Sequence, residues 1–256
     1  MTGLALTLHQ FRYDQKIFWR NPATVFFTVM FPVMFLVLLG VIVSGETIHS
    51  LGGIDATTYF VPAVITLAVV SATMVNLAMS LTILREGGIL KRLRGTPLPS
   101  WVFIAGRIGN AIVTALLMFV LVTALGRILF GVPVPWSRLG ALVVTLAVGS
   151  ASFCALGVAL TTIIPSRESA PAITNMIVFP LYFLSGVFIP ESEIPSGVLH
   201  VADAFPVRHL FDALLTGFNP ATAGAGFELG NLTVVAAWGL AGLALAVSRF
   251  RWEPRI

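Results

Sequence analysis

The chain has 256 residues, of which 57% are hydrophobic and 10% are charged. Soluble domains carry about 25% charged residues, so this composition and a mean hydropathy of +0.96 exclude an ordinary water-soluble protein. The formal net charge is +4. Because the basic residues cluster beside long apolar runs, we attribute this charge to membrane topology and not to nucleic-acid binding. The single cysteine, Cys154, excludes an internal disulfide or a cysteine-based metal site.

Residues 4–20 predict a helix that lies in the plane of the membrane interface. Apolar and polar side chains are arranged there as in an amphipathic surface helix, and Trp19 is suited to the headgroup level. The apolar set is Leu4, Leu8, Phe11, Ile17 and Phe18, and the polar set is His9, Arg12, Asp14, Lys16 and Arg20. Asn21-Pro22 breaks this helix. The next run, 25–43, is interpreted as a retained span, because it is longer than the core of a typical signal peptide.

Six continuous apolar runs follow, and each is long enough to cross a membrane as a helix. About 20 helical residues cross a hydrocarbon core of about 30 Å, and the absence of strict alternation excludes an outer-membrane barrel. The predicted spans are 22–44, 59–84, 102–130, 139–164, 170–188 and 229–250.

The basic residues indicate how these spans are oriented. With the N-terminus inside, 12 lysines and arginines fall in inside segments and 3 fall outside. An excess of this size marks the cytoplasmic side. The three outside residues are Arg127, Arg138 and Arg208. We therefore expect a multi-pass protein of the plasma membrane (a bacterial inner membrane) with both termini in the cytoplasm.

The segment 189–228, between the last two spans, is too long for a turn and too apolar for a free loop. Pro195 can open a helix over 196–204, and Pro206 can open another that stops at Gly217. The second helix has one apolar face, formed by Val207, Leu210, Phe211, Leu214 and Leu215. Irregular backbone at membrane depth must pack on protein or line a wet cavity. Two interpretations fit: a half-inserted, re-entrant hairpin, or a lid on the outer surface.

The stretch 85–100 is a compact basic loop between the second and third spans. A short helix is predicted there and ends before Pro97 and Pro99. Its apolar side holds Ile89, Leu90 and Leu93, and its other side holds Lys91, Arg92 and Arg94. A soluble motor could push on such a helix. Alternatively, the loop is solvated and lies near anionic lipid headgroups, which also attract lysine and arginine.

Two motifs resemble a known family. The run REGGILKRLRGTPLP at 85–99 is similar to the cytoplasmic signature of type-2 ABC exporter permeases of the daunorubicin-resistance class. The run LSGVFIP at 184–190, followed by Ile194-Pro195 and by FPVRH at 205–209, resembles the region between the last two spans of that family. The resemblance covers essentially the whole chain, with six spans and an amphipathic start in the same order.

The resemblance implies a dimer of two permeases, a second copy or a paralogue, bound to two ABC ATPase subunits. ATP and Mg²⁺ would be bound by those partner subunits, and ATP binding would switch the paired permeases from inward-facing to outward-facing. The first cytoplasmic loop and the N-terminal helix would contact the ATPases. The coupling residues that we assign on this basis are Arg85, Glu86, Leu90, Lys91, Arg92, Leu93 and Arg94.

The chain has no phosphate-binding P-loop of its own. That motif needs a lysine directly after a glycine, and the two lysines, Lys16 and Lys91, do not follow one. We therefore expect no enzymatic activity and no cofactor in this chain. Its energy must come from a partner subunit or from an ion gradient.

A gradient-driven carrier is the alternative class. Such carriers place ionisable groups within their spans, and these spans hold almost none. The notable polar or aromatic candidates for a substrate path are Asn76, Asn110, Asn175 and Phe179. Asparagines in membrane helices also commonly hydrogen-bond to neighbouring helices, so both roles stay open for them.

The sequence thus predicts an all-α integral membrane protein with six transmembrane helices in one permease domain, 1–256. Residues 1–21 form its interfacial helix, 85–100 its coupling loop and 189–228 its outer re-entrant hairpin. We expect it to export an amphipathic drug or lipid by alternating access, in contact with membrane lipid and without nucleic acid. Within the family, the alternative is export of a lipid-linked glycan.

Overall fold

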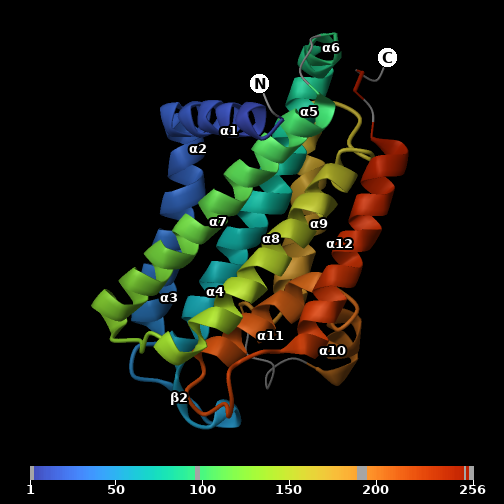
Figure 1. Ribbon diagram of the computed structural model, residues 1–256. Coiled ribbons are helices and arrows are strands. Elements are labelled where there is room, and N and C mark those ends of the chain that lie inside the picture. Colours follow the sequence, from blue (N-terminus) through green and yellow to red (C-terminus); the bar gives the residue numbers. More distant parts are fainter. Residues whose placement is uncertain (1–2, 96–98, 189–194, 251, 254–256) are drawn as a thin grey trace.

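The computed structural model describes residues 3–95, 99–188, 195–250 and 252–253. The protein is a helical bundle with two small strands at one end, β1 (Thr47–Ile48) and β2 (Ile54–Asp55) (Figure 1). The strands pair antiparallel, with Thr47 opposite Asp55. A short 3-10 helix, η2 (His49–Leu51), connects them. This two-stranded ladder was not predicted from the sequence. We call this end of the bundle the α11 end and the opposite end, near α1 and α6, the α6 end.

The apolar runs form helices close to the predicted positions. They are α2 (Pro22–Val25), π-helix η1 (Phe26–Met30) and α3 (Phe31–Ile42), then α4 (Ala56–Val70), π-helix η3 (Ser71–Val75) and α5 (Asn76–Glu86), and then α7 (Ser100–Phe130), η4 (Trp136–Arg138), α8 (Leu139–Leu160), α9 (Ala170–Leu184) and α12 (Leu229–Arg249). Among the described residues, four stretches are long and apolar enough to cross a membrane: Ala56–Glu86, Trp101–Phe130, Trp136–Leu160 and Leu229–Arg249. Thr28–Ile42 and Ala170–Leu184 are shorter apolar helices. These helices are those of a multi-pass membrane protein.

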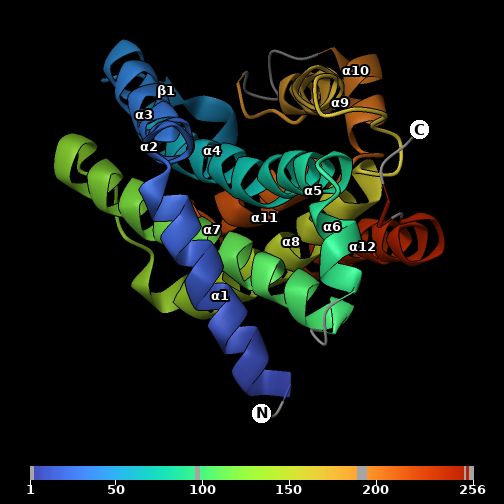
Figure 2. The same ribbon diagram turned by 90° about the horizontal axis from the view of Figure 1, so that it is seen from above.

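The continuous helix from α4 to α5 is the centre of the bundle, with other helices around it when seen from above (Figure 2). Every residue of α4 is buried. A helix that is apolar on all sides belongs inside a protein or a membrane. Two threonines of the central helix bond to its own backbone: the Thr66 hydroxyl donates to the Pro62 carbonyl at 2.8 Å, and the Thr73 hydroxyl donates to the Val69 carbonyl at 2.6 Å.

Glycines let two helices approach this central helix closely. A Cβ on Gly157 of α8 would lie 2.8 Å from the Met74 carbonyl oxygen, and one on Gly126 of α7 would lie 2.6 Å from Val61 Cγ2. Small residues at such crossings are common in membrane proteins, because packing and not the hydrophobic effect drives helix association there.

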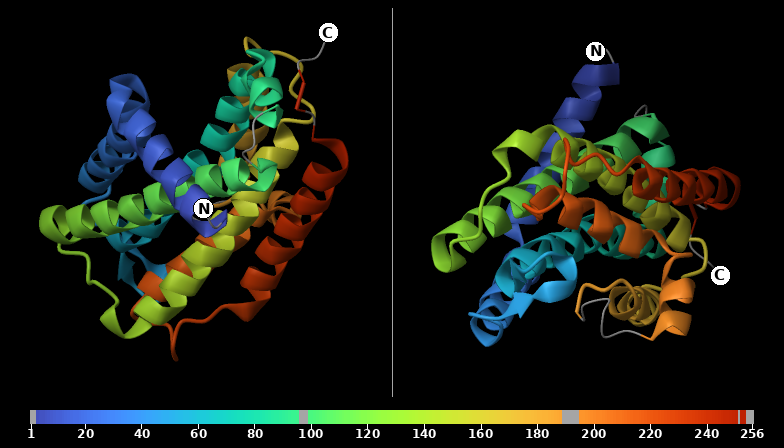
Figure 3. Two further views of the ribbon diagram at one scale, coloured as in Figure 1. Left: turned by 45° about the horizontal axis from the view of Figure 1, so that its top comes forward. Right: turned by 90° about the horizontal axis from the view of Figure 1, so that it is seen from below.

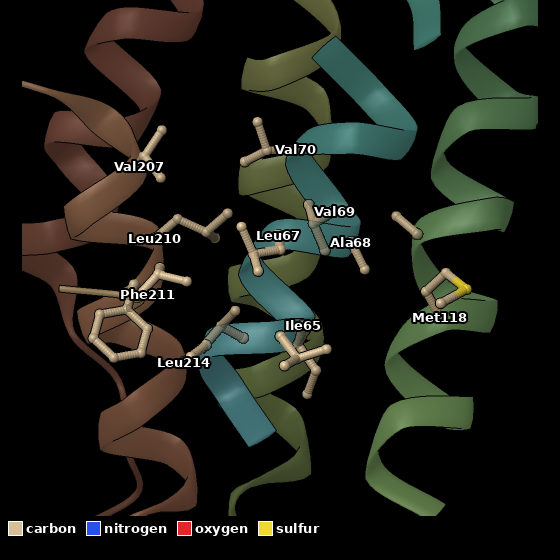
Figure 4. Close-up of a cluster of buried hydrophobic side chains, with 14 of the residues drawn as sticks. Ile65, Leu67, Ala68, Val69, Val70, Met118, Val207, Leu210, Phe211 and Leu214 are labelled. Carbon is tan, nitrogen blue, oxygen red and sulfur yellow. The ribbon is translucent and has the colours of Figure 1, made fainter. Parts of the chain in front are cut away.

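Two helices occupy the segment before α12, as the prolines predict. They are α10 (Ser196–Ala202) and α11 (Pro206–Phe218). Residues 189–194, the start of the predicted hairpin segment, lie outside the described residues. Seen from below, α11 runs across the middle of the bundle (Figure 3). Its apolar face, which includes Leu210 and Leu214, packs toward α4 (Figure 4).

The packing of α11 is reciprocal with α8. A Cβ on Gly149 of α8 would lie 2.7 Å from Leu210 Cδ1, and Gly217 of α11 in turn receives Leu142 of α8. Most of α11 is therefore buried, and its half-buried residues, His209, Asp212 and Thr216, lie along one stripe.

Helix α1 (Gly3–Arg20) lies across the start of α7 (Figure 2). Phe11 and Phe18 face inward, as the amphipathic pattern predicts, but Leu8 and Ile17 are about half exposed. Asp14, which we placed on the polar side, is buried. The sequence analysis was wrong on this residue because its partner comes from α7, 93 positions further along the chain (Arg107 minus Asp14).

Candidate functional site

The basic loop folds into a short helix, α6 (Ile89–Arg94), joined to α5 by two glycines. The Gly88 backbone has φ of +68°, a left-handed conformation that glycine adopts without steric cost. The chain turns sharply there, and the Gly88 carbonyl accepts a hydrogen bond from the Arg92 N–H at 3.2 Å. The predicted helix is therefore present. Residues 96–98 of the motif lie outside the described residues.

Arg85 does not lie on the surface of this loop. Its side chain is buried at the end of α5, with 1% exposed. Its guanidinium donates to the carbonyls of Thr161 and Ile164, both at 2.6 Å. These carbonyls lie just past the end of α8, where the last turn of a helix leaves acceptors without partners. Arg85 therefore ties the end of α5 to the end of α8.

Glu86 completes this arrangement. One of its carboxylate oxygens accepts a hydrogen bond from Arg85 Nε at 2.6 Å. A buried cation needs a counter-charge and satisfied hydrogen bonds to offset its desolvation. The predicted coupling residues Arg85 and Glu86 are thus engaged with each other and with α8.

The remaining coupling residues divide into an anchor and an exposed surface. Leu90 is fully buried and Leu93 is half-buried, and both pack in one apolar cluster with Phe103 of α7. Lys91 and Arg92 are exposed, and so is Ile89, which we predicted on the apolar side. The side chain of Arg94 lies outside the described residues. Helix α6 is therefore attached by leucines and presents cations outward.

A second cationic contact joins α1 to α7 near α6. Arg107 Nε lies 3.4 Å from Asp14 Oδ1, and Gln10 donates to the same oxygen at 3.3 Å. Burial raises the pKa of the Asp14 carboxyl above its ordinary value of 3.8, while Arg107 and Gln10 oppose this shift. The close approach of the two helices depends on Gly106, where a Cβ would lie 2.6 Å from Gln10 Cγ.

The four candidate path residues do not share one surface. Asn175 and Phe179 are exposed on α9, one turn apart. Asn76 is half-buried at the start of α5, and Asn110 is on α7 with a buried Oδ1 that has no hydrogen-bond partner. Helices α7 and α9 lie on opposite sides of the central helix (Figure 2). The structure therefore separates Asn110 from the pair on α9.

Sequence reasoning missed the role of Arg138. We counted it only as a charge on the outer side, but its guanidinium donates to the carbonyls of Thr216, Asn219 and Thr222, at and just beyond the end of α11. In the first turn of α11, Arg208 is buried and pairs with Asp203 at 2.8 Å. No local pattern in the sequence marks the Arg138 contacts, because their carbonyls belong to the backbone of a distant segment.

Among the residues described, no group of three histidine, cysteine, aspartate or glutamate side chains is placed to hold a metal ion.

Comparison with known proteins identifies the family. Residues 7–219 match the model of the ABC-2 type transporter family. The chain belongs to this family. The predicted resemblance is therefore confirmed. The matched domain is a membrane permease domain without a nucleotide-binding site.

Individual relatives are distant. The chain is 23% identical to the inner membrane transport permease YadH of Escherichia coli K12 over 185 residues, which are 72% of this chain and 71% of YadH. It is 23% identical to the probable multidrug ABC transporter permease YbhR of the same strain over 159 residues, 62% of this chain. That match spans 43% of YbhR, less than half of its length. It is also 28% identical to nodulation protein J of Rhizobium meliloti over 69 residues, 27% of this chain and 26% of that protein.

Proposed function

We propose that this chain is the membrane-spanning permease subunit of an ATP-driven exporter, working with a second permease copy and with ABC ATPase subunits that bind ATP and Mg²⁺. Membership of the ABC-2 type transporter family supports this proposal. The single observation that carries it is α6, an exposed cationic helix fixed to the bundle by buried Leu90 and by the adjacent Arg85 clamp.

The geometry suggests how force passes through α6. An ATPase that binds Lys91 and Arg92 would move α6, and the Leu90 anchor would carry this motion to the cluster at the end of α5. Arg85 would carry this motion on to α8, because its hydrogen bonds to the Thr161 and Ile164 carbonyls join the end of α5 to the end of α8. Arg85, Glu86, Leu90 and Leu93 then act as positioning residues, and Lys91, Arg92 and Arg94 as contacts.

We further propose the membrane arrangement. The chain acts as one permease domain with six spans, because the two shorter apolar helices, Thr28–Ile42 and Ala170–Leu184, run beside the four longer ones (Figure 1). The α6 end faces the cytoplasm, where the basic residues gather. Helix α11 is the inserted arm of a re-entrant hairpin, supported by its burial among α4 and α8.

For the substrate, we propose an amphipathic drug or lipid. One relative, YbhR, is named a probable multidrug transporter permease. The exposed face of α9, with Asn175 and Phe179, combines an amide and an aromatic ring on an otherwise apolar surface. A path between two permease copies along this face would suit a molecule that is itself partly apolar.

The coupling proposal is tested by reversing the exposed charges of α6. The double variant Lys91→Glu, Arg92→Glu should lose copurification with the ATPase subunit and lose substrate-stimulated ATP hydrolysis, while the permease itself stays folded. The matched control is Arg167→Glu, which removes an exposed cation, paired with Glu168, from the loop after α8. If the double variant retained ATPase binding and transport at the level of the control, α6 would be a solvated loop and the coupling proposal would be wrong.

A further inference from the structure

A groove of about 670 Å³ opens on the side of the bundle between α7, α8 and α12. It runs from the middle of the bundle toward the α6 end, where Phe250 and Trp252 line it. Its other lining residues are almost all aliphatic or small, and include Ile108, Val158, Leu243 and Val247. The volume lies within the range of about 300–1,000 Å³ found for ligand sites.

The floor of the groove is set by a close crossing of α8 and α12. A Cβ on Gly242 of α12 would lie 3.0 Å from the Leu156 backbone nitrogen, and Gly239 lies against Ser152. The backbones touch there, so the longer side chains of α7 and α12 stand up on either side. The groove is therefore a feature of helix geometry and not of one mobile side chain.

Water is a poor occupant of this groove. Apolar cavities stay dry, because water needs two to four polar partners, and Ser152 supplies the main polar side chain in the lining. An empty groove would forfeit the dispersion contacts of its walls. A single acyl chain is narrow and apolar enough to fill it.

The charges around the α6 end indicate which headgroup belongs to that chain. Arg249, in the last turn of α12, is exposed beside the groove residues Val247 and Phe250. Lys91 and Arg92 are exposed on α6, whose leucines share an apolar cluster with Phe250 and Trp252. Of the described acids at this end, Asp14, Glu86 and Glu168 are paired with arginines, which leaves exposed Glu253.

We propose that this groove binds one acyl chain of an anionic phospholipid from the leaflet at the α6 end, with the lipid phosphate beside Arg249. A bilayer surrounds the acyl chain with apolar matter in any case, so selectivity must come from the headgroup and from the shape of the groove. The lipid would also contact the cluster that anchors α6, and would thereby stabilise the seat of that helix. This site is separate from the transport proposal, since it requires neither an ATPase nor nucleotide.

The binding test uses the purified full chain and native mass spectrometry. The protein is reconstituted with phosphatidylglycerol or with phosphatidylcholine of identical acyl chains, and the retained lipid is counted. Each basic side chain near a membrane surface favours anionic lipid about fivefold. We expect phosphatidylglycerol to be retained about fivefold better. Arg249→Gln should remove that preference, and Arg12→Gln, which removes an exposed cation of α1, should not. Equal retention of the two lipids, or an unchanged preference in Arg249→Gln, would overturn the proposal.

The groove itself is tested by filling it. Ala236→Phe places a ring in the lining, whereas Ala237→Phe places the same ring on the exposed side of α12. Only the first should lose the retained lipid. A variant-free measurement accompanies it: phosphatidylglycerol with a photoreactive acyl chain should label peptides of α12 and α8 in the native protein. Equal retention in the two variants, labelling spread evenly onto α3, or a second protein chain crosslinked in the groove would each contradict an acyl-chain site.

Discussion

Arg85 and Arg138 make the same kind of contact at opposite ends of the molecule. Each donates from its guanidinium to backbone carbonyls at or just past the end of a helix, Arg85 beyond α8 and Arg138 at and beyond α11. Such carbonyls have no partner within the helix, and a cation near a helix C-terminus is favourable. The surroundings differ. Arg85 is buried and ion-paired with Glu86, whereas Arg138 is partly exposed.

The helices next to the two arginines differ in their exposure. Beyond Arg85 lies α6, a six-residue helix with exposed cations. Helix α11 ends at the carbonyls to which Arg138 donates, and it is buried on almost every side. One end of the bundle thus has a rigid clamp below a small exposed helix, and the other has a helix fixed inside the bundle. A soluble partner can bind the first arrangement, whereas the second closes the bundle.

The largest expected effect is the loss of the buried clamp. Arg85→Met leaves the Glu86 carboxylate and two carbonyls without a partner, and removing one member of a buried ion pair costs about 3–5 kcal/mol. Arg138→Met should cost less, about 1.5–3 kcal/mol, because water can reach the freed carbonyls. Denaturant unfolding in detergent micelles measures both. Arg92→Met, an exposed cation, is the control. If Arg85→Met matched this control, Arg85 would not be a structural clamp.

Next in size is the packing of α11 against α8. Gly149→Leu inserts a side chain where Leu210 already lies, and overpacking of a dense core costs about 1–3 kcal/mol. A Cβ at Gly140 on the same helix would meet no atom within 4 Å, so Gly140→Leu serves as the control. Single cysteines introduced along α11, in a chain without Cys154, should become more accessible to labelling in the first variant alone. If these cysteines stayed protected from labelling in Gly149→Leu, the burial of α11 would not depend on the contact between Leu210 and Gly149.

A smaller effect is expected at the turn into α6. Gly88→Ala forces a left-handed conformation on alanine, at a cost of about 1–2 kcal/mol. Gly95→Ala, at the other end of α6 with φ of −82°, should be close to neutral. We expect Gly88→Ala to displace α6 and so to reduce ATPase coupling. The free energy of unfolding should fall only slightly, because the strain is confined to this turn. Equal coupling in the two alanine variants would contradict this role of the turn.

The smallest effect concerns pH at the contact between α1 and α7. Burial raises the pKa of Asp14 in the folded protein above its unfolded value. The folded state therefore holds this proton more tightly, so the stabilisation is fully present below the unfolded pKa and is lost as pH rises through the folded pKa. Asp14→Asn should remove this dependence from unfolding curves recorded across acidic pH, while Asp55→Asn, an exposed acid at the other end, should retain it. If Asp14→Asn left the pH dependence of the free energy of unfolding unchanged, protonation of Asp14 would not contribute to the contact between α1 and α7.

Helix α6, Arg85 and Asp14 illustrate what could and could not be predicted from the sequence. A short helix within 85–100 that ends before Pro97 and Pro99 follows from the sequence, and α6 lies within that stretch. The inward direction of Arg85 does not follow, because its acceptors are carbonyls of residues 161 and 164, which carry no side-chain signature. The same holds for Asp14, which reads as a surface acid until α7 brings Arg107 beside it.

Hydropathy and chain-breaking residues by themselves determined which stretches of this protein form apolar helices, because crossing a membrane requires long apolar runs with their backbone bonds satisfied internally. Only the tertiary structure decided which helix lies inside. The most apolar stretches of Ala56–Glu86 and Leu229–Arg249 are similarly suited to a membrane, yet 83% of the first is buried and 28% of the second. Lipid tails are as apolar as leucine, so composition does not distinguish a helix that faces protein from one that faces lipid.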